Sequence, residues 1–404
     1  MNKKKAIWIF TIIVALSGLG LGMSDSLLSN YFRDAFEVTA FQRGIIELPR
    51  EAPGILILFI VSGLAFLGDK KLTIIAHVLS AIGIFALGIL SPSFNVMLVF
   101  LFIFSLGVHM FIPLYDSLGL SLAQDGNYGR VLGRFNATRT AFSLLAGVLV
   151  FIGFRSGFFS FTTPRIVNFI FAGVFFIAIA VLMVYLLKLN GDNPSKARIV
   201  LRKEYGKFYV MASLFGGRKQ IIFVYGPWVL IELFNFSADS MALLIIAGSA
   251  ISIFFIPILG RLIDKYGAVK MMIVEVVTFF VLYLGYGLIS ASVYGGWLFS
   301  MGLGVAIAIA INLLDRVVFN FNMARSVYVR SIARDPADVT PTLATGLALD
   351  HVFSIICSIL CGWIWVQFGP HYVFVFSGVL AVLQLLVTLS ARSQLGDTQN
   401  GKEC

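Results

Sequence analysis

Long apolar runs separated by short polar segments dominate the chain. Twelve runs can be marked, and most are at least as long as the roughly 20 apolar residues with which a helix crosses a bilayer. They cover residues 6–32, 41–67, 72–90, 94–122, 131–154, 166–188, 205–233, 241–262, 269–291, 297–329, 343–367 and 373–389. The runs are continuous rather than alternating, which predicts membrane-spanning helices and not a membrane β-barrel.

Composition agrees with this pattern. Of 404 residues, 59% are hydrophobic and only 12% are charged, whereas a soluble domain carries about 25% charged residues. The chain is therefore predicted to be an integral membrane protein, with the lipid bilayer as a partner. No basic block is interleaved with aromatic residues in a polar domain, so nucleic acid is not an expected partner. The three cysteines lack the spacing of a disulfide framework or a metal site, so no metal or cofactor is expected.

Lysine and arginine are distributed unevenly between alternate polar segments. With the N-terminus inside, twenty of the thirty cations fall in cytoplasmic segments, four in outer segments and six within spans. This bias follows the positive-inside rule and predicts that both termini are cytoplasmic. We expect a multi-pass protein of the cell membrane.

The longest hydrophilic stretch divides the runs into two sets of six. The predicted organisation is a six-helix bundle at 1–189, a cytoplasmic central loop at 190–204, a second six-helix bundle at 205–391 and a cytoplasmic tail at 392–404. Each half places an Asp-Lys pair after its second span, Asp69-Lys70 and Asp264-Lys265. Paired halves of this kind are typical of transporters that bind substrate near the bilayer midplane.

The second of these pairs lies in a longer motif. Residues 260–270 read GRLIDKYGAVK and match G-x-x-x-D-[RK]-x-G-x-x-[RK]. The sequence thereby resembles the major facilitator superfamily, whose signature loop follows spans two and eight. The first half keeps Asp69 and its lysine but has Ala65 and Leu72 in place of the two glycines.

The resemblance implies an all-α membrane fold of twelve transmembrane helices in two pseudo-symmetric six-helix bundles. It also implies that the motif closes the cytoplasmic side during transport. The residues given this gating role are Gly260, Asp264, Lys265, Gly267, Lys270 and Asp69.

In this family spans one, four, seven and ten line the central cavity, and here each carries polar residues. The residues expected to line the cavity are Asp25, His109, Asp116, Arg218, Lys219, Gln220, Asn312, Asp315 and Arg316. A cation at mid-membrane costs about 2.5–3.5 kcal/mol on insertion scales, so Arg218 and Lys219 need partners or water. Two interpretations stay open: the pair binds an acidic substrate, or it forms structural ion pairs between helices.

Proton coupling needs carboxylates or histidines whose pKa responds to burial and neighbours. The candidates are Asp25, Glu51, Asp116 and Asp315. For His109 a hydrogen bond between helices competes with a relay role, and for Asp350-His351 a contact between helices is favoured.

The sequence therefore predicts a monomeric secondary transporter that moves a small solute, one with an acidic group, by proton-coupled alternating access. One alternative is a drug/proton antiporter, although span five, at 140–149, lacks the G-x-x-x-G-P-x-x-G-G pattern of many such exporters. Another is a receptor of the same fold without transport. An enzyme is not expected, because the four histidines are scattered and no phosphate-binding loop is present. Substrate identity, direction and coupling ion are not fixed by the sequence.

Overall fold

The computed structural model describes residues 3–36, 40–91, 93–124, 126–159, 166–192, 201–234, 236, 238–295 and 301–400. Every regular element in these ranges is a helix, so the prediction of an all-α fold is confirmed. Part of the predicted central loop, at 193–200, and the last tail residues, at 401–404, lie outside the described residues.

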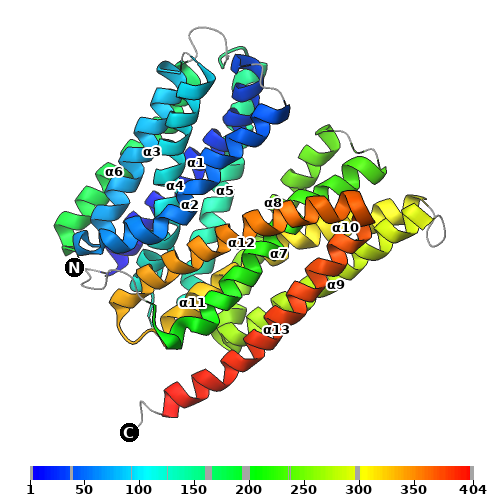
Figure 1. Cartoon of the computed structure of the whole chain (residues 1–404). Coiled ribbons are helices and arrows are strands. Elements are labelled where there is room, and N and C mark those ends of the chain that lie inside the picture. Colours follow the sequence, from blue (N-terminus) through cyan, green and yellow to red (C-terminus); the bar gives the residue numbers. More distant parts are fainter. Residues whose placement is uncertain are drawn as a thin grey trace. The chain divides into compact units, whose positions relative to one another are not determined.

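The helices follow the apolar runs closely (Figure 1). Their bounds are α1 Lys3–Phe36, α2 Ala40–Gly63, α3 Asp69–Ile89, α4 Phe94–Leu122, α5 Tyr128–Arg155, α6 Ile166–Asn190, α7 Gly206–Trp228, α8 Ala238–Tyr266, α9 Ala268–Gly295, α10 Met301–Val318, α11 Met323–Ile332, α12 Val339–Phe368 and α13 Pro370–Asn400. Because α10 and α11 form one candidate span, Gly302–Ile332, the described chain holds twelve long helical segments.

Ten of these segments are long and apolar enough to cross a membrane by length and composition alone. The other two are α2 and α7, which carry several charged residues within their apolar runs. Helix α2 contains Arg50, Glu51 and two prolines, and α7 contains Arg218 and Lys219. Charges concentrated in these two helices must therefore find partners or water.

A short break separates α10 from α11. The 3₁₀ turn Phe319–Asn322 lies between them, and the Asn320 side chain donates hydrogen bonds to the carbonyls of Arg316 and Val317 at 2.9 and 3.1 Å. Asparagine side chains compete with the backbone for such carbonyls, which disfavours a continuous α-helix. The break places Asn322 and Arg325 beside each other at the start of α11.

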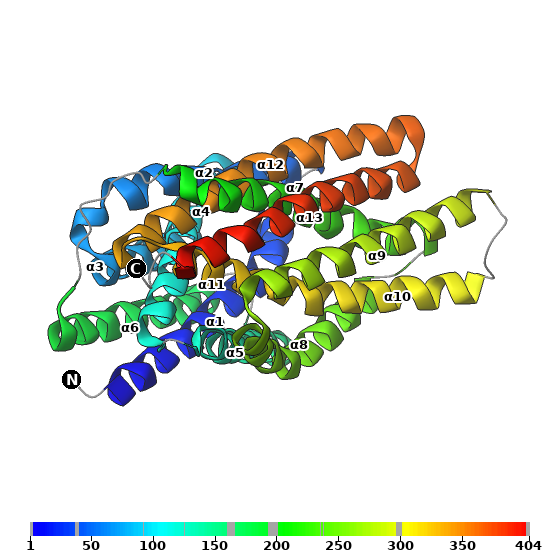
Figure 2. The ribbon, with the colours of Figure 1, turned by 90° about the horizontal axis from the view of Figure 1, so that it is seen from below.

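The described helices group into two compact units. One contains Met1–Asp125, Arg134–Val200 and Asp335–Thr345, and the other contains Gly126–Gly133, Leu201–Arg334 and Gly346–Cys404. In the first, α3 lies beside α4 and α6; in the second, α13 lies beside α9 and α7 (Figures 1 and 2). The first turn of α5 belongs to the second unit and the first turn of α12 to the first unit. The domain boundaries given above stay a prediction.

Small residues allow close helix packing inside the first unit. A Cβ atom at Gly107 would lie 2.3 Å from the Ala76 carbonyl oxygen, and one at Gly83 would lie 2.3 Å from the Phe104 backbone nitrogen. Helices α3 and α4 therefore meet backbone to backbone, as membrane helices do where glycine lines their interface.

Large apolar side chains cover the outer faces of the helices. Phe254 is 77% exposed and Val366 is 78% exposed, with many valines, leucines and isoleucines like them. Water would not tolerate so much apolar surface, whereas lipid does. The ion cluster described next is buried inside the second unit.

Candidate functional site

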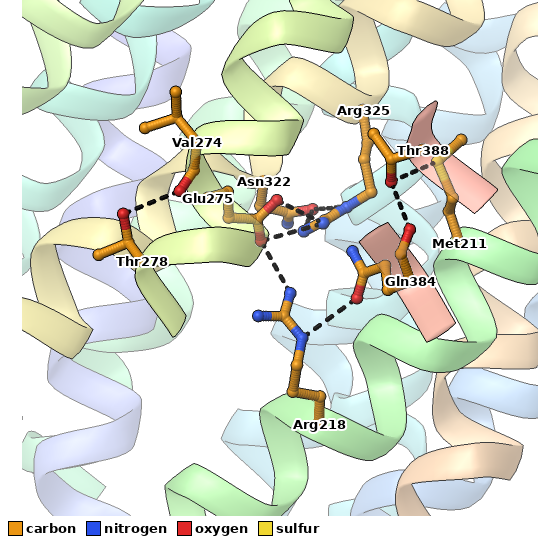
Figure 3. Close-up of polar contacts among 9 residues, drawn as sticks. All are labelled: Met211, Arg218, Val274, Glu275, Thr278, Asn322, Arg325, Gln384 and Thr388. Atoms are coloured by element: carbon orange, nitrogen blue, oxygen red, sulfur yellow. Dashed lines mark hydrogen bonds and ion pairs between the residues drawn. The ribbon is translucent and has the colours of Figure 1, made fainter. Parts of the chain in front are cut away.

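A buried ion cluster joins four helical segments of the second unit (Figure 3). Glu275 on α9 accepts from Arg218 on α7 at 3.2 Å and from Arg325 on α11 at 3.0 and 3.1 Å. The Gln384 side-chain oxygen on α13 accepts from Arg218 Nε at 3.1 Å. All three charged residues are at most 4% exposed. Arg218 on α7 is thus held by side chains on two other helices, α9 and α13.

Further contacts surround the two guanidinium groups, although Arg218 Nη1 has no hydrogen-bond partner among the described residues. The Asn322 oxygen accepts from Arg325 at 2.7 and 3.0 Å. Aromatic rings also cover both cations. The Phe215 ring centroid lies 3.4 Å from Arg325 Cζ, and the Phe279 ring centroid lies 4.4 Å from Arg218 Cζ. Such cation–π contacts strengthen where water is excluded. Breaking a buried ion pair by removing one partner typically costs about 3–5 kcal/mol, so this cluster strongly constrains the packing of the unit.

Lys219 turns to a different partner. Its ammonium lies 2.6 Å from Asp350 Oδ1 on α12, with 14% and 11% of the two side chains exposed. Gly216 makes this contact possible, because a Cβ atom there would lie 2.2 Å from the Asp350 carbonyl oxygen. The Ser354 hydroxyl completes the junction by donating to the Gly216 carbonyl at 2.9 Å. The Lys219–Asp350 pair is therefore an interhelical contact that retains some solvent access.

One polar residue of α10, Asp315, lies near this cluster. Asp315 is 6% exposed, and its Oδ1 atom has no hydrogen-bond partner among the described residues. Arg218 and Arg316 both lie within electrostatic range of this carboxyl group. Arg316 Nε lies 3.5 Å from Asn312 Oδ1, so the i, i+4 pair does share a helix face. Gln220 on α7 is half-buried.

In the first unit, the candidate residues are more accessible. Asp25 on α1 is exposed, whereas Glu51, His109 and Asp116 are half-buried. His109 Nδ1 lies 3.0 Å from the hydroxyl of Ser105, which donates to the Arg50 carbonyl on α2 at 2.6 Å. Through Ser105, His109 thus belongs to a polar contact between α4 and α2.

The two motif aspartates also bind particular partners. Asp264 accepts from the backbone N–H groups of Gly129 and Arg130, at 2.7 and 2.8 Å, within the second unit. Within the first unit, Asp69 Oδ2 accepts from the hydroxyls of Ser117 and Thr340, both at 2.7 Å. Each aspartate therefore contacts the first turn of a long helix, α5 for Asp264 and α12 for Asp69. The other motif cations and glycines, Lys265, Lys270 and Gly267, are exposed.

Several contact residues were not assigned to a site from the sequence. Glu275 and Arg325 were visible as charges inside apolar runs, which is a usable signal. Gln384 and Asn322 carry no such signal, because a single amide in an apolar run is unremarkable until its helix neighbours are known.

Comparison with known proteins decides the family. A family model described as Major Facilitator Superfamily matches residues 10–333. The chain belongs to the major facilitator superfamily. The resemblance carried by the loop at 260–270 is thereby confirmed, as is the expectation of a multi-pass membrane protein with this transporter fold. No curated protein matches the chain in sequence.

Solved structures of other transporters share the fold. A bacterial homologue of the iron transporter ferroportin superposes with a TM-score of 0.77 at 13% identity, over 96% of this chain and 99% of that one. The proton:xylose symporter XylE gives 0.75 at 15%, over 96% of each chain. The human organic anion transporter MFSD10 gives 0.71 at 12%, over 96% and 100%. At these identities the likeness concerns the fold alone.

Proposed function

We propose that this protein moves a small solute across the membrane by alternating access, coupled to proton movement. Family membership supports transport in general, because members of the superfamily are transporters. The solute, the coupling ion and the residues that act on them are our inference from the chemistry of the two units. The expected setting is the cell membrane, with the protein acting as a monomer.

The observation that carries the proposal is the pair of motif aspartates. Asp69 and Asp264 occupy corresponding places in the two halves of the sequence, and each holds the first turn of a helix from the other half. Such contacts must form and break if the two halves alternate between arrangements. We therefore assign the gating role to these aspartates rather than a role in substrate binding.

Proton coupling is assigned to carboxylates of the spans. Asp25 is exposed although it lies in a candidate membrane span. Because an ion in hydrocarbon costs at least about 2.5–3.5 kcal/mol, such a group requires water or a partner. Asp315 is the opposite case, a buried carboxyl group with one oxygen that has no donor in the described part of the chain. Asp25 and Asp315 are the first carriers to test, with Glu51 and Asp116 after them.

The proposed substrate carries an acidic group. Arg218 is committed to Glu275 and Gln384, so the structural interpretation suits it better than substrate binding. Lys219 differs, because its partner Asp350 is a single carboxylate and the pair is partly accessible. A substrate carboxylate can compete with Asp350 for Lys219, because the partial solvent access of the pair allows the displaced Asp350 carboxylate to be hydrated. One fold relative is an organic anion transporter, which is consistent with this assignment.

Transport in proteoliposomes tests the proposal. Purified protein is reconstituted with an internal pH dye, and organic acids, amino acids, sugars and cationic drugs are added in turn. The expected result is a pH change with one class of acids, lost in both Asp25→Asn and Lys219→Gln. Lys188→Gln, an exposed lysine at the end of α6, is the matched control and should transport normally.

Other outcomes would redirect or end the proposal. A pH change with cationic drugs alone would establish the antiporter alternative. Uptake of a labelled solute without a pH change would remove proton coupling. No uptake of any solute, with folded protein in the vesicles, would favour a receptor without transport.

A further inference from the structure

A groove runs along the membrane-embedded face of the second unit between α9 and α13, which lie side by side in both views (Figures 1 and 2). Its volume is about 490 Å³. Almost all of its lining is apolar, with Leu284 and Leu288 from α9 facing Val375 and Val379 from α13. These four side chains are 47–55% exposed, so the groove opens outward rather than into the ion cluster.

Two glycines create the groove. Gly287 on α9 has only the Phe374 Cβ, at 3.6 Å, and the His371 carbonyl oxygen, at 3.9 Å, within reach of an added Cβ atom. Gly378 on α13 has only ring atoms of Phe280, the nearest at 3.6 Å. These are ordinary van der Waals separations, so neither glycine is needed for helix contact. Their missing side chains instead leave the space that forms the groove.

The length of the groove matches one leaflet of a bilayer. Its lining on α13 runs from His371 to Leu383, which at 1.5 Å per residue is about 18 Å. Half of the hydrocarbon core of a typical bilayer is about 15 Å thick. His371 lies in the first turn of α13, directly after the break at Gly369 that ends α12. The groove therefore begins at one membrane surface and ends near the midplane.

The two ends of the groove differ in polarity. His371 lies at the end where α13 begins, and its ring is tilted against that of Tyr372 with centroids 4.3 Å apart. This end of the groove therefore offers a polar imidazole group. The midplane end is formed in part by the ring of Tyr283, whose hydroxyl lies near Arg218. A polar mouth over an apolar interior is complementary to the upper part of a phospholipid.

We propose that this groove binds one phospholipid acyl chain from the leaflet at the start of α13, with the ester region beside His371. The bilayer supplies this occupant wherever the protein is inserted. A chain seated there packs against the ring of Tyr283, the residue that connects the groove to the buried cluster around Arg218. Binding at the groove is independent of the transported solute.

The test uses full-length protein in nanodiscs that contain phosphatidylcholine with a diazirine on one acyl chain. After illumination, peptide mass spectrometry locates the labelled residues. Labelling of α9 and α13 should exceed that of Val366, an exposed apolar residue elsewhere on the unit, by roughly ten-fold, which corresponds to about 1.4 kcal/mol of preferential binding. Gly287→Leu and Gly378→Leu fill the groove and should each reduce labelling to the level at Val366.

Gly302→Leu is the matched control, because this exposed helical glycine has open space around it and lies outside the groove. It should label like the wild type. Uniform labelling of all exposed helices, or labelling unchanged in both groove variants, would overturn the proposal. Native mass spectrometry of the same samples should find one retained phospholipid per chain. Retention of a second protein copy at this face instead would also overturn it.

Discussion

The two motif aspartates of this protein lie on opposite sides of their turns. In the first half, Gly68 has a φ of 85° and precedes Asp69, which begins α3. In the second half, Asp264 lies in the last turn of α8, and Gly267, with a φ of 87°, follows it. Only glycine adopts such backbone angles readily. The glycine of the turn has therefore moved relative to the aspartate, which explains why Leu72 replaces the second motif glycine.

The hydrogen-bond partners of the two aspartates also differ. Asp264 uses both carboxylate oxygens, each accepting one backbone N–H of α5. Asp69 uses a single oxygen, which accepts both the Ser117 and the Thr340 hydroxyl. Backbone contact requires the chains to approach closely, whereas hydroxyl side chains reach across a wider gap.

This difference accounts for the first motif glycine. A Cβ atom at Gly260 would lie 2.4 Å from the Gly129 carbonyl oxygen, and one at Gly129 would lie 2.6 Å from the Gly260 carbonyl oxygen. The second half therefore needs glycine where the first half has Ala65. The first half departs from the motif but keeps a contact of the same kind between its aspartate and the first turn of a long helix. It forms this contact with side-chain hydroxyls instead of backbone N–H groups.

The largest effect on transport is expected from substituting alanine for the first motif glycine, Gly260. Gly260→Ala introduces a Cβ atom that clashes with the Gly129 carbonyl oxygen and that no rotamer change can move away. Overpacking of this kind costs about 1–3 kcal/mol. We expect faster hydrogen exchange over residues 128–133 and slower transport. Ala65→Gly is the reverse substitution in the first half. It should destabilise the contact by no more than the roughly 0.5–1 kcal/mol that added backbone freedom costs, so hydrogen exchange and transport should change little. Equal effects of the two variants would contradict the difference between the halves.

A second prediction compares Asp264→Asn with Asp69→Asn. In the first variant an NH₂ group replaces one acceptor and faces a backbone N–H, a donor opposite a donor. We expect about 1–2 kcal/mol of lost contact, or roughly ten-fold slower turnover, with solute affinity changed much less. In the second variant the remaining oxygen still accepts both hydroxyls, so the effect should be several times smaller.

Two results would count against this interpretation. A loss of affinity in Asp264→Asn without slower turnover would place that aspartate at the substrate site. A larger defect in Asp69→Asn than in Asp264→Asn would show that charge, and not the number of acceptor oxygens, decides the contact.

Removing one hydroxyl donor should have a smaller effect. Thr340→Val keeps the shape of the side chain and removes one bond to Asp69, worth about 0.5–1.5 kcal/mol. Hydrogen exchange at residues 339–345 should increase a few-fold, while exchange at 128–133 stays unchanged. Thr340→Ser, which retains the hydroxyl, is the control and should behave like the wild type.

The fold was predictable because the apolar runs define helices directly, and the loop at 260–270 carries a specific pattern. The rotation of each helix about its own axis, which decides the face that points into the protein, was not predictable. In α7 and α9 apolar residues surround the whole helix, since lipid and protein interior are equally apolar. The sequence therefore indicated that Arg218 needs a partner, but not that Glu275 on α9 provides it.

Asp192 shows the same limit of sequence-based prediction for the proposed gating contacts. Its carboxylate accepts from the backbone N–H groups of Lys70 and Lys71 at 3.2 and 2.9 Å, and a Cβ atom at Gly68 would lie 2.4 Å from its carboxyl carbon. A residue more than a hundred positions away thus caps the start of α3. Capping motifs in sequence are recognised by local spacing, so nothing near Asp69 announced this partner.

The smallest effect is expected at this cap. Asp192→Ala removes the acceptor for the first turn of α3, and loss of a helix cap costs about 0.5–2 kcal/mol, toward the lower end where the group is partly exposed as here. Hydrogen exchange at residues 69–72 should rise, with a slight slowing of transport through the displaced Asp69. Asp192→Asn should have an intermediate effect, because its one remaining oxygen accepts one of the two N–H groups while its NH₂ group faces the other. Asp192→Ala could instead slow transport as much as Gly260→Ala. That result would make the cap part of the proposed gating contact. The first half would then depend on Asp192 as strongly as the second half depends on Gly129 and Gly260.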